Sequence, residues 1–158
     1  MKLIKLENLF EMEYGAPCPI IVADDNSLLV SFFGNSSNDA DIGVNAPQEI
    51  ITIEFIRFAK YSFGMPNEEN LSGHPYYKLG LHTAGFFELK ESPYIFELRE
   101  IAQQHPYFNV TRWNNYRHFI ITFLDRFFEC VSQEFRVQKA SMTRQEQKMS
   151  LINRISDL

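Results

Sequence analysis

Residues 118–132 of this chain read HFIITFLDRFFECVS, two runs of β-branched and aromatic residues separated by the triplet Leu124-Asp125-Arg126. Residues of these kinds are enriched in β-strands, and a short break between two such runs is typical of a hairpin. The stretch therefore predicts two antiparallel strands, over residues 118–123 and 127–132, that belong to a β-sheet.

Other apolar runs supply further strands for this sheet. Residues 19–23 and 28–33 flank a polar turn and predict another hairpin, and residues 85–89 predict a short strand. Residues 49–58 form the longest apolar stretch, and a strand with apolar side chains on both faces is expected in the interior of a sheet. Residues 135–137 are expected to extend or follow the strands of the first hairpin. The runs together predict one antiparallel or mixed sheet.

Two helices have clear start signals. Ser92-Pro93 places a capping serine before a proline at the first helical position, and the apolar residues that follow recur with the 3.6-residue period of a helix. Thr143-Arg144-Gln145-Glu146 has the spacing of a capping box. We expect helices at about 93–104, packed on one face of the sheet, and at about 143–156. The fold class is therefore α+β, with a single domain over residues 1–158.

The C-terminal helix carries a narrow apolar stripe of Met149, Ile152 and Ile155. We expect this stripe to pack on its own domain, and a homodimer formed through it is the alternative.

Two segments without apolar periodicity predict loops. Residues 35–47 are rich in Ser, Asn, Asp and Gly, which indicates a surface loop. Residues 64–80 predict a longer loop, and loops of that length inside a compact domain are more often functional than short ones.

Three features of the sequence indicate the cellular compartment of the protein. Residues 1–7 lack the apolar run of a secretory signal, and no apolar run reaches the length of a membrane-spanning helix. Cys18 and Cys130, the only cysteines, have no C-x-x-C spacing, which favours a reducing compartment. We expect a cytoplasmic protein without a membrane span.

The charge of the chain is acidic and uneven. The net charge is −5, and residues 1–100 carry 7 Lys/Arg against 15 Asp/Glu, while residues 101–158 carry 8 against 5. A phosphate backbone is bound by a positive surface, so nucleic acid is not expected as a partner. A basic protein partner would be attracted instead, although a solvated surface that keeps the protein in solution explains the same charges.

Histidines are the first candidates for chemistry. A metal or acid-base site could draw on His74, His82, His105 and His118, but no helical His-x-x-x-His spacing supports it. The structural interpretation is that His74 and His105, each followed by proline, turn corners and bond to nearby backbone, while His118 ends a strand. A possible cleft would combine three of these histidines with nearby polar residues. Its candidate lining residues are His74, Tyr77, His105, His118, Asp125 and Glu129.

A thiol nucleophile is a second chemical hypothesis. Cys130 would act as the nucleophile with His118 as its base, since a reactive cysteine needs a neighbouring group that holds the thiolate. In a strand, however, Cys130 shares a face with Phe128 and Ser132, which favours a buried, inert thiol. The chain has no Gly-rich phosphate loop, no G-x-S-x-G sequence and no dinucleotide fingerprint.

A stretch between the first predicted helix and the hairpin mixes aromatic residues with arginine. This composition is typical of protein-binding hot spots, and its basic content is too low for RNA. The alternative is that Trp113 is a core or loop-anchoring residue. The candidate binding residues are Tyr107, Phe108, Arg112, Trp113, Tyr116 and Arg117.

A spaced pattern of residues runs through the central segment. It consists of His74-Pro75-x-Tyr77, Gly80-Leu81, Ser92 ahead of the helix, His105-Pro106, and His118-Phe119-Ile120-x-Thr122-Phe123-x-Asp125-x-x-Phe128-Glu129-Cys130. With this pattern, residues 74–132 resemble a small bacterial family of uncharacterised proteins. The resemblance implies a bacterial origin and a shared fold, and it supplies no catalytic residues. A histidine would be expected beside Asp125, where Leu124 stands, and its absence weakens an acid-base or metal role at that turn.

These observations favour a non-catalytic cytoplasmic binding protein. We expect an immunity- or antitoxin-like inhibitor of a basic protein partner, with neither a cofactor nor a bound metal. A metal-dependent or thiol enzyme that uses the region of His74, His105 and His118 is the alternative, and a structural subunit of a larger assembly is a third possibility.

Overall fold

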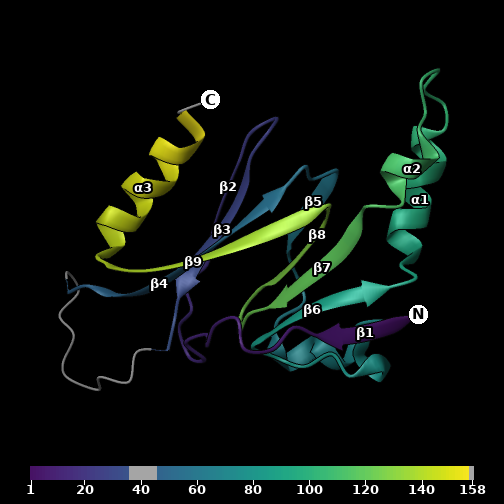
Figure 1. Ribbon diagram of the computed structural model, residues 1–158. Helices are drawn as coiled ribbons and strands as arrows, with labels where there is room; N and C mark the ends of the chain where they lie inside the picture. Colours follow the sequence, from purple (N-terminus) through teal and green to yellow (C-terminus); the bar gives the residue numbers. More distant parts are fainter. Residues whose placement is uncertain (36–45, 157–158) are drawn as a thin grey trace. The chain divides into compact units, whose positions relative to one another are not determined.

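The computed structural model describes residues 1–35 and 46–156. In this part of the chain there are nine β-strands, three α-helices and two short 3₁₀ helices (Figure 1). The α+β class is confirmed. By their internal contacts the residues divide into unit 1, Met1–Leu6 with Phe58–Glu134, and unit 2, Glu7–Arg57 with Phe135–Leu158. The single domain expected over residues 1–158 stays a prediction.

Unit 1 contains a five-stranded antiparallel sheet. The predicted hairpin is confirmed as β7 and β8, and the short strand at residues 85–89 is confirmed as β6. The edge strand β5 was not predicted. In sheet order the strands are β1 (Lys2–Lys5), β6 (Gly85–Lys90), β7 (Arg117–Thr122), β8 (Phe127–Ser132) and β5 (Lys60–Gly64).

One face of this sheet is covered by the segment that follows β5. The segment contains the 3₁₀ helices η1 (Glu68–Gly73) and η2 (Tyr77–Leu79), within the loop predicted at residues 64–80. Its buried Leu71 and Leu81 pack against Phe87, Ile120 and other sheet residues. This packing forms the hydrophobic core on the face that carries the candidate histidines.

Helix α1 (Pro93–Ala102) follows β6 directly. The Ser92 cap is confirmed, because its hydroxyl oxygen accepts hydrogen bonds from the backbone N–H groups of Tyr94 at 3.1 Å and Ile95 at 3.3 Å. The helix ends at Ala102, two residues before the predicted end. A one-turn helix, α2 (Val110–Trp113), lies in the stretch of candidate binding residues.

Unit 2 contains a four-stranded sheet. Its strands, in sheet order, are β2 (Ile20–Ala23), β3 (Leu28–Phe33), β4 (Gln48–Ile56) and β9 (Glu134–Met142). The predicted hairpin β2–β3 and the interior position of β4 are confirmed. The expectation of one sheet is wrong, because β4 and the β7–β8 hairpin belong to different sheets. Strand β9 extends the second sheet beside β4 rather than the hairpin. Most of the loop predicted at residues 35–47 lies outside the described residues.

Helix α3 (Arg144–Ser156) completes unit 2. The capping box is confirmed, because the Thr143 hydroxyl accepts from Glu146 N–H at 3.1 Å and the Glu146 carboxylate accepts from Thr143 N–H at 3.0 Å. The helix buries Gln147 and Leu151, and the Gln147 amide donates to Ser31 Oγ at 2.8 Å.

The expectation that the apolar stripe of α3 packs on its own domain is therefore wrong in part. Met149 is 52% exposed and Ile152 is 51% exposed, because the helix turns its Gln147 face toward β3 instead. Ile155 is half-buried.

Candidate functional site

A chain of buried hydrogen bonds joins α1 to the five-stranded sheet of unit 1. Ser92 Oγ lies 2.7 Å from His118 Nδ1, and His118 Nε2 lies 2.9 Å from Glu129 Oε2. Ser92 is 7% exposed and His118 is fully buried, whereas the Glu129 side chain reaches solvent. Register places His118 opposite Val131 and Ile120 opposite Glu129, so His118 and Glu129 lie on the same face of the sheet.

The hydrogen-bond capacity of Ser92 determines which atoms donate and which accept in this network. A hydroxyl has one hydrogen and two lone pairs, and both lone pairs of Ser92 accept from amide groups of α1. The hydroxyl hydrogen is then donated to Nδ1 of His118, which leaves the Nε2 hydrogen for the Glu129 carboxylate. Each polar group of the Ser92–His118–Glu129 network therefore has a hydrogen-bond partner.

Burial and neighbouring groups shift the pKa values of Glu129, His74 and Tyr94 around this network. Burial raises the pKa of the Glu129 carboxyl, but the hydrogen bond from His118 and the nearby imidazoles of His118 and His74 outweigh burial and lower it. Burial lowers the pKa of His74. Burial, with the carboxylate of Glu129 nearby, raises the pKa of Tyr94 to about 12. Glu129 is therefore ionised and Tyr94 is protonated at neutral pH.

The hydrogen-bonded groups follow the order serine, histidine, carboxylate, which is the order in an acyl-transfer triad. A nucleophilic serine, however, needs an open approach to its oxygen, and Ser92 Oγ is enclosed by His118 and two amide groups. The network fixes the start of α1 against β7 and β8, and it engages the hydrogen and both lone pairs of Ser92 Oγ.

The geometry of the sheet prevents His118 from acting as the base for Cys130. Cys130 pairs with Phe119, one position away from His118 on β7, so the thiol and the imidazole lie on opposite faces of the sheet. Cys130 is fully buried, and burial raises the pKa of its thiol well above the usual value. The buried, inert thiol is the interpretation that this geometry supports.

The two His-Pro signatures form the same local corner. His74 Nδ1 accepts from Tyr76 N–H at 3.1 Å, and His105 Nδ1 accepts from Tyr107 N–H at 3.0 Å. The structural interpretation of these histidines is thus confirmed. His74 also stacks on Phe127, with ring centroids 4.7 Å apart.

Only part of the predicted cleft comes together. His74, His118 and Glu129 are neighbours, whereas the ring of His105 contacts Tyr107 in the segment between α1 and α2. Elsewhere, Tyr77 is 46% exposed on η2, Asp125 is exposed in the β7–β8 turn, and His82 bonds to the carbonyl of Thr83. Within residues 1–35 and 46–156, no group of three or more His, Cys, Asp or Glu residues is arranged to hold a metal ion.

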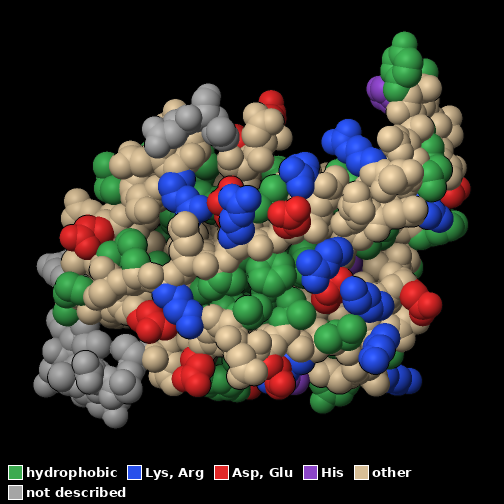
Figure 2. All heavy atoms as spheres, in the orientation of Figure 1, with side chains coloured by type: hydrophobic (Ala, Val, Ile, Leu, Met, Phe, Trp, Pro, Cys, Tyr) green, Lys and Arg blue, Asp and Glu red, His purple; other side chains and the backbone are tan. Residues whose placement is uncertain are grey.

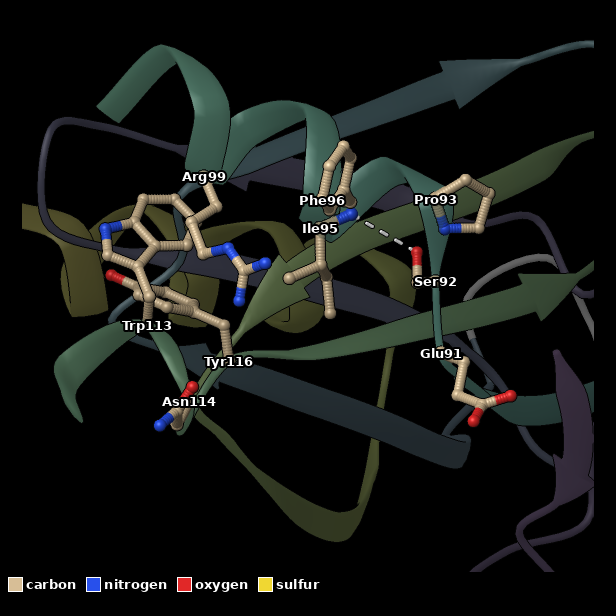
Figure 3. Close-up of a pocket in the computed structure, with 9 residues that line it drawn as sticks. All are labelled: Glu91, Ser92, Pro93, Ile95, Phe96, Arg99, Trp113, Asn114 and Tyr116. Atoms are coloured by element: carbon tan, nitrogen blue, oxygen red, sulfur yellow. Dashed lines mark hydrogen bonds between the residues drawn. The ribbon is translucent and has the colours of Figure 1, made fainter. Parts of the chain in front are cut away.

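A pocket of about 540 Å³ lies between α1 and the α2 segment, entirely within unit 1 (Figure 3). Trp113 and Tyr116, whose ring centroids are 4.7 Å apart, form one wall, and Ile95 of α1 lies opposite them. The guanidinium group of Arg99 points into the space between these walls (Figure 3). The lining residues are Glu91, Ser92, Pro93, Ile95, Phe96, Arg99, Trp113, Asn114 and Tyr116.

The candidate binding residues divide between this pocket and its surroundings. Trp113 and Tyr116 line the pocket, Arg112 is exposed on α2, and Phe108 is half-buried. Tyr107 is 87% exposed in the segment that connects α1 and α2. Figure 2 shows hydrophobic side chains on the surface of this segment, at the upper right.

Arg117, the remaining candidate, has a partner inside the fold. Its Nη2 and Nε donate to the buried carboxylate of Glu88 at 2.7 and 2.9 Å, and Lys90 binds the same carboxylate at 2.6 Å. Burial raises the pKa of Glu88, but these cations outweigh burial and lower it.

The sequence prediction did not include Arg99 or Phe96 among the binding residues. Arg99 stands four residues after Ile95 and three after Phe96, so the three share one face of α1. That spacing was the available signal. It was missed because the helix was interpreted through its apolar period alone.

No family model, no curated protein and no solved structure matches this chain. The resemblance to a bacterial family stays a prediction. The structure does bring together four residues of the pattern that carries it, His74, Ser92, His118 and Glu129. Among the described residues, no helix is both long and apolar enough to cross a membrane.

Proposed function

We propose that the protein is a non-catalytic cytoplasmic binding protein, an immunity- or antitoxin-like inhibitor that binds a protein partner through the α1–α2 pocket and its rim. The observation that carries the proposal is a pocket in which Arg99, whose buried Nε–H group has no hydrogen-bond partner, faces the contacting rings of Trp113 and Tyr116 (Figure 3). Trp, Tyr and Arg dominate the binding energy of protein interfaces.

The rings of the pocket are already held in place in the free protein. Trp113 and Tyr116 are half-buried and contact one another, so little side-chain entropy is lost when a partner covers them. Tyr107 and Arg112 add exposed groups in the same segment of the chain.

The negative net charge of unit 2 supports the proposal that the partner is basic. The sequence of unit 2 contains 6 Lys/Arg and 11 Asp/Glu, a net charge of −5, while unit 1 contains 9 of each. A basic partner is then attracted chiefly by the acidic residues of unit 2, and this attraction raises the association rate at low salt.

The test begins with tagged protein purified from its own cells and identification of a stoichiometric partner by mass spectrometry. The dissociation constant of that complex is then measured for the wild type and for Trp113→Ala and Tyr107→Ala. We expect each variant to bind at least about tenfold more weakly, as for residues at the centre of an interface.

The matched control for Tyr107→Ala is Tyr77→Ala, because Tyr77 is also an exposed tyrosine of unit 1 and lies outside the pocket. Its affinity is expected to equal that of the wild type. Unchanged affinity in both Trp113→Ala and Tyr107→Ala would exclude this surface.

A further inference from the structure

Arg99 lines the pocket, where its guanidinium lies 5.5 Å from the centroid of the Phe96 ring and one of its hydrogen-bond donors is unsatisfied. Its Nε–H group is buried without a hydrogen-bond partner, and its guanidinium forms no ion pair with the described residues. Native proteins rarely leave a buried donor of a charged group unpaired, because the loss of its hydration is not compensated. A negatively charged acceptor in the pocket would give the Arg99 guanidinium a charged partner.

The carboxylate that lines the same pocket does not neutralise Arg99. Glu91 lies at the other end of the pocket in Figure 3, and its carboxylate accepts from the amino group of Met1 at 3.0 Å. The interior of the pocket therefore keeps the positive charge of Arg99 for a bound group.

Apolar or aromatic side chains stand beside polar ones in the walls around Arg99. Five of the nine lining residues are apolar or aromatic: Trp113, Tyr116, Phe96, Ile95 and Pro93. The volume of about 540 Å³ lies within the range of ordinary ligand pockets. One guanidinium balances one negative charge, so a monoanion suits these walls better than a phosphate dianion, whose second charge would be left without a partner.

We propose that the α1–α2 pocket binds a carboxylate attached to an apolar or aromatic group, held by a charge-assisted hydrogen bond from Arg99 and by contact with Trp113 and Tyr116. This inference rests on the proposed function, and the occupant is an Asp or Glu side chain of the protein partner beside a large apolar residue. A partner with a basic surface presents this single acidic group to the pocket.

The experiment uses Trp113 as its reporter, because it is the only tryptophan in the chain and it lines the pocket. The full-length protein is titrated with 3-phenylpropanoate and, separately, with 3-phenylpropanamide, while tryptophan fluorescence is recorded. We expect a saturable change with both probes and a dissociation constant at least about tenfold lower for the acid, as for a charged rather than a neutral hydrogen bond.

Arg99→Gln is expected to remove the preference for the acid, and Arg99→Lys to retain part of it, since lysine keeps the charge and loses the planar fork. Arg126→Gln is the matched control, because Arg126 is an exposed arginine of unit 1 in the β7–β8 turn, outside the pocket, and it is expected to keep the full preference. Equal affinity for acid and amide in the wild type would overturn the inference. Tighter binding of phenyl phosphate than of the acid would overturn the carboxylate class.

The partner complex separates this inference from the proposed function. Arg99→Gln is expected to weaken the complex at least about tenfold. If only Trp113→Ala weakens it, the binding function stands and the carboxylate inference is overturned. If no protein partner exists and the acid preference persists, the carboxylate pocket stands, while the protein partner as its source is overturned.

Discussion

Replacing Ser92 with alanine removes two kinds of interaction at once. The hydroxyl oxygen caps α1 by accepting from Tyr94 and Ile95, and the hydroxyl hydrogen is donated to Nδ1 of His118. Alanine leaves the first turn of the helix uncapped. It also leaves the Nδ1 acceptor of a fully buried imidazole without a partner.

The two losses have different sizes. Loss of an N-cap hydroxyl costs about 1 kcal/mol of the free energy of unfolding. A buried acceptor left unpaired costs about 1–3 kcal/mol more, because no water reaches it. Ser92→Ala is therefore expected to lower the free energy of unfolding by about 2–4 kcal/mol, a large share of the stability of an ordinary domain.

Asn109→Ala is the control, because Asn109 caps α2 in the same unit and is exposed, with no buried group depending on it. Its expected cost is about 1 kcal/mol or less. Urea unfolding followed by the fluorescence of Trp113 reports on unit 1 directly. Equal costs for the two variants would refute the reasoning, since they would show that His118 does not depend on Ser92.

Further predictions concern ionisation and reactivity. The lowered pKa values of Glu88 and Glu129 stabilise the folded state fully above the ordinary carboxyl value of 4.5, and this stabilisation is lost as pH falls through the folded values. Urea unfolding between pH 3 and 6 is expected to show this loss, and Glu129→Gln to reduce it. A thiol reagent is expected to label only Cys18, which is exposed, in the native protein, and Cys130 as well in urea, as counted by mass spectrometry. A fluorophosphonate reagent is expected to leave Ser92 unlabelled, and labelling would restore the triad interpretation.

Local patterns in the sequence predicted the elements that depend on neighbouring residues. The hairpin at residues 118–132, the Ser92 cap and the capping box at Thr143 are set by turn chemistry and helix ends, so their signals lie within a few positions. The partition of strands into two sheets has no such signal. The apolar pattern of residues 135–137 is the same whichever sheet accepts them.

The candidate sites depend on contacts between distant residues. Ser92 meets His118 across 26 positions, and this contact follows from the register of β6, β7 and β8 rather than from a motif. The charge of Arg99 was visible in the sequence, but the lack of a hydrogen-bond partner for its Nε–H group was not. On α3, the bond from Gln147 to Ser31 decides which face is buried, and an apolar period cannot predict a polar anchor.

The buried network and the pocket meet at Ser92, which belongs to both. Arg99 stands seven residues later, two helical turns along the same face of α1, so the position of the helix start sets where the guanidinium lies. Ser92 is in this view a positioning residue for the pocket. We expect Ser92→Ala to weaken binding of 3-phenylpropanoate several-fold relative to the amide, and Ser92→Thr, which keeps the hydroxyl, to restore it. An unchanged preference for the acid in a folded Ser92→Ala protein would mean that the network stabilises unit 1 without shaping the pocket.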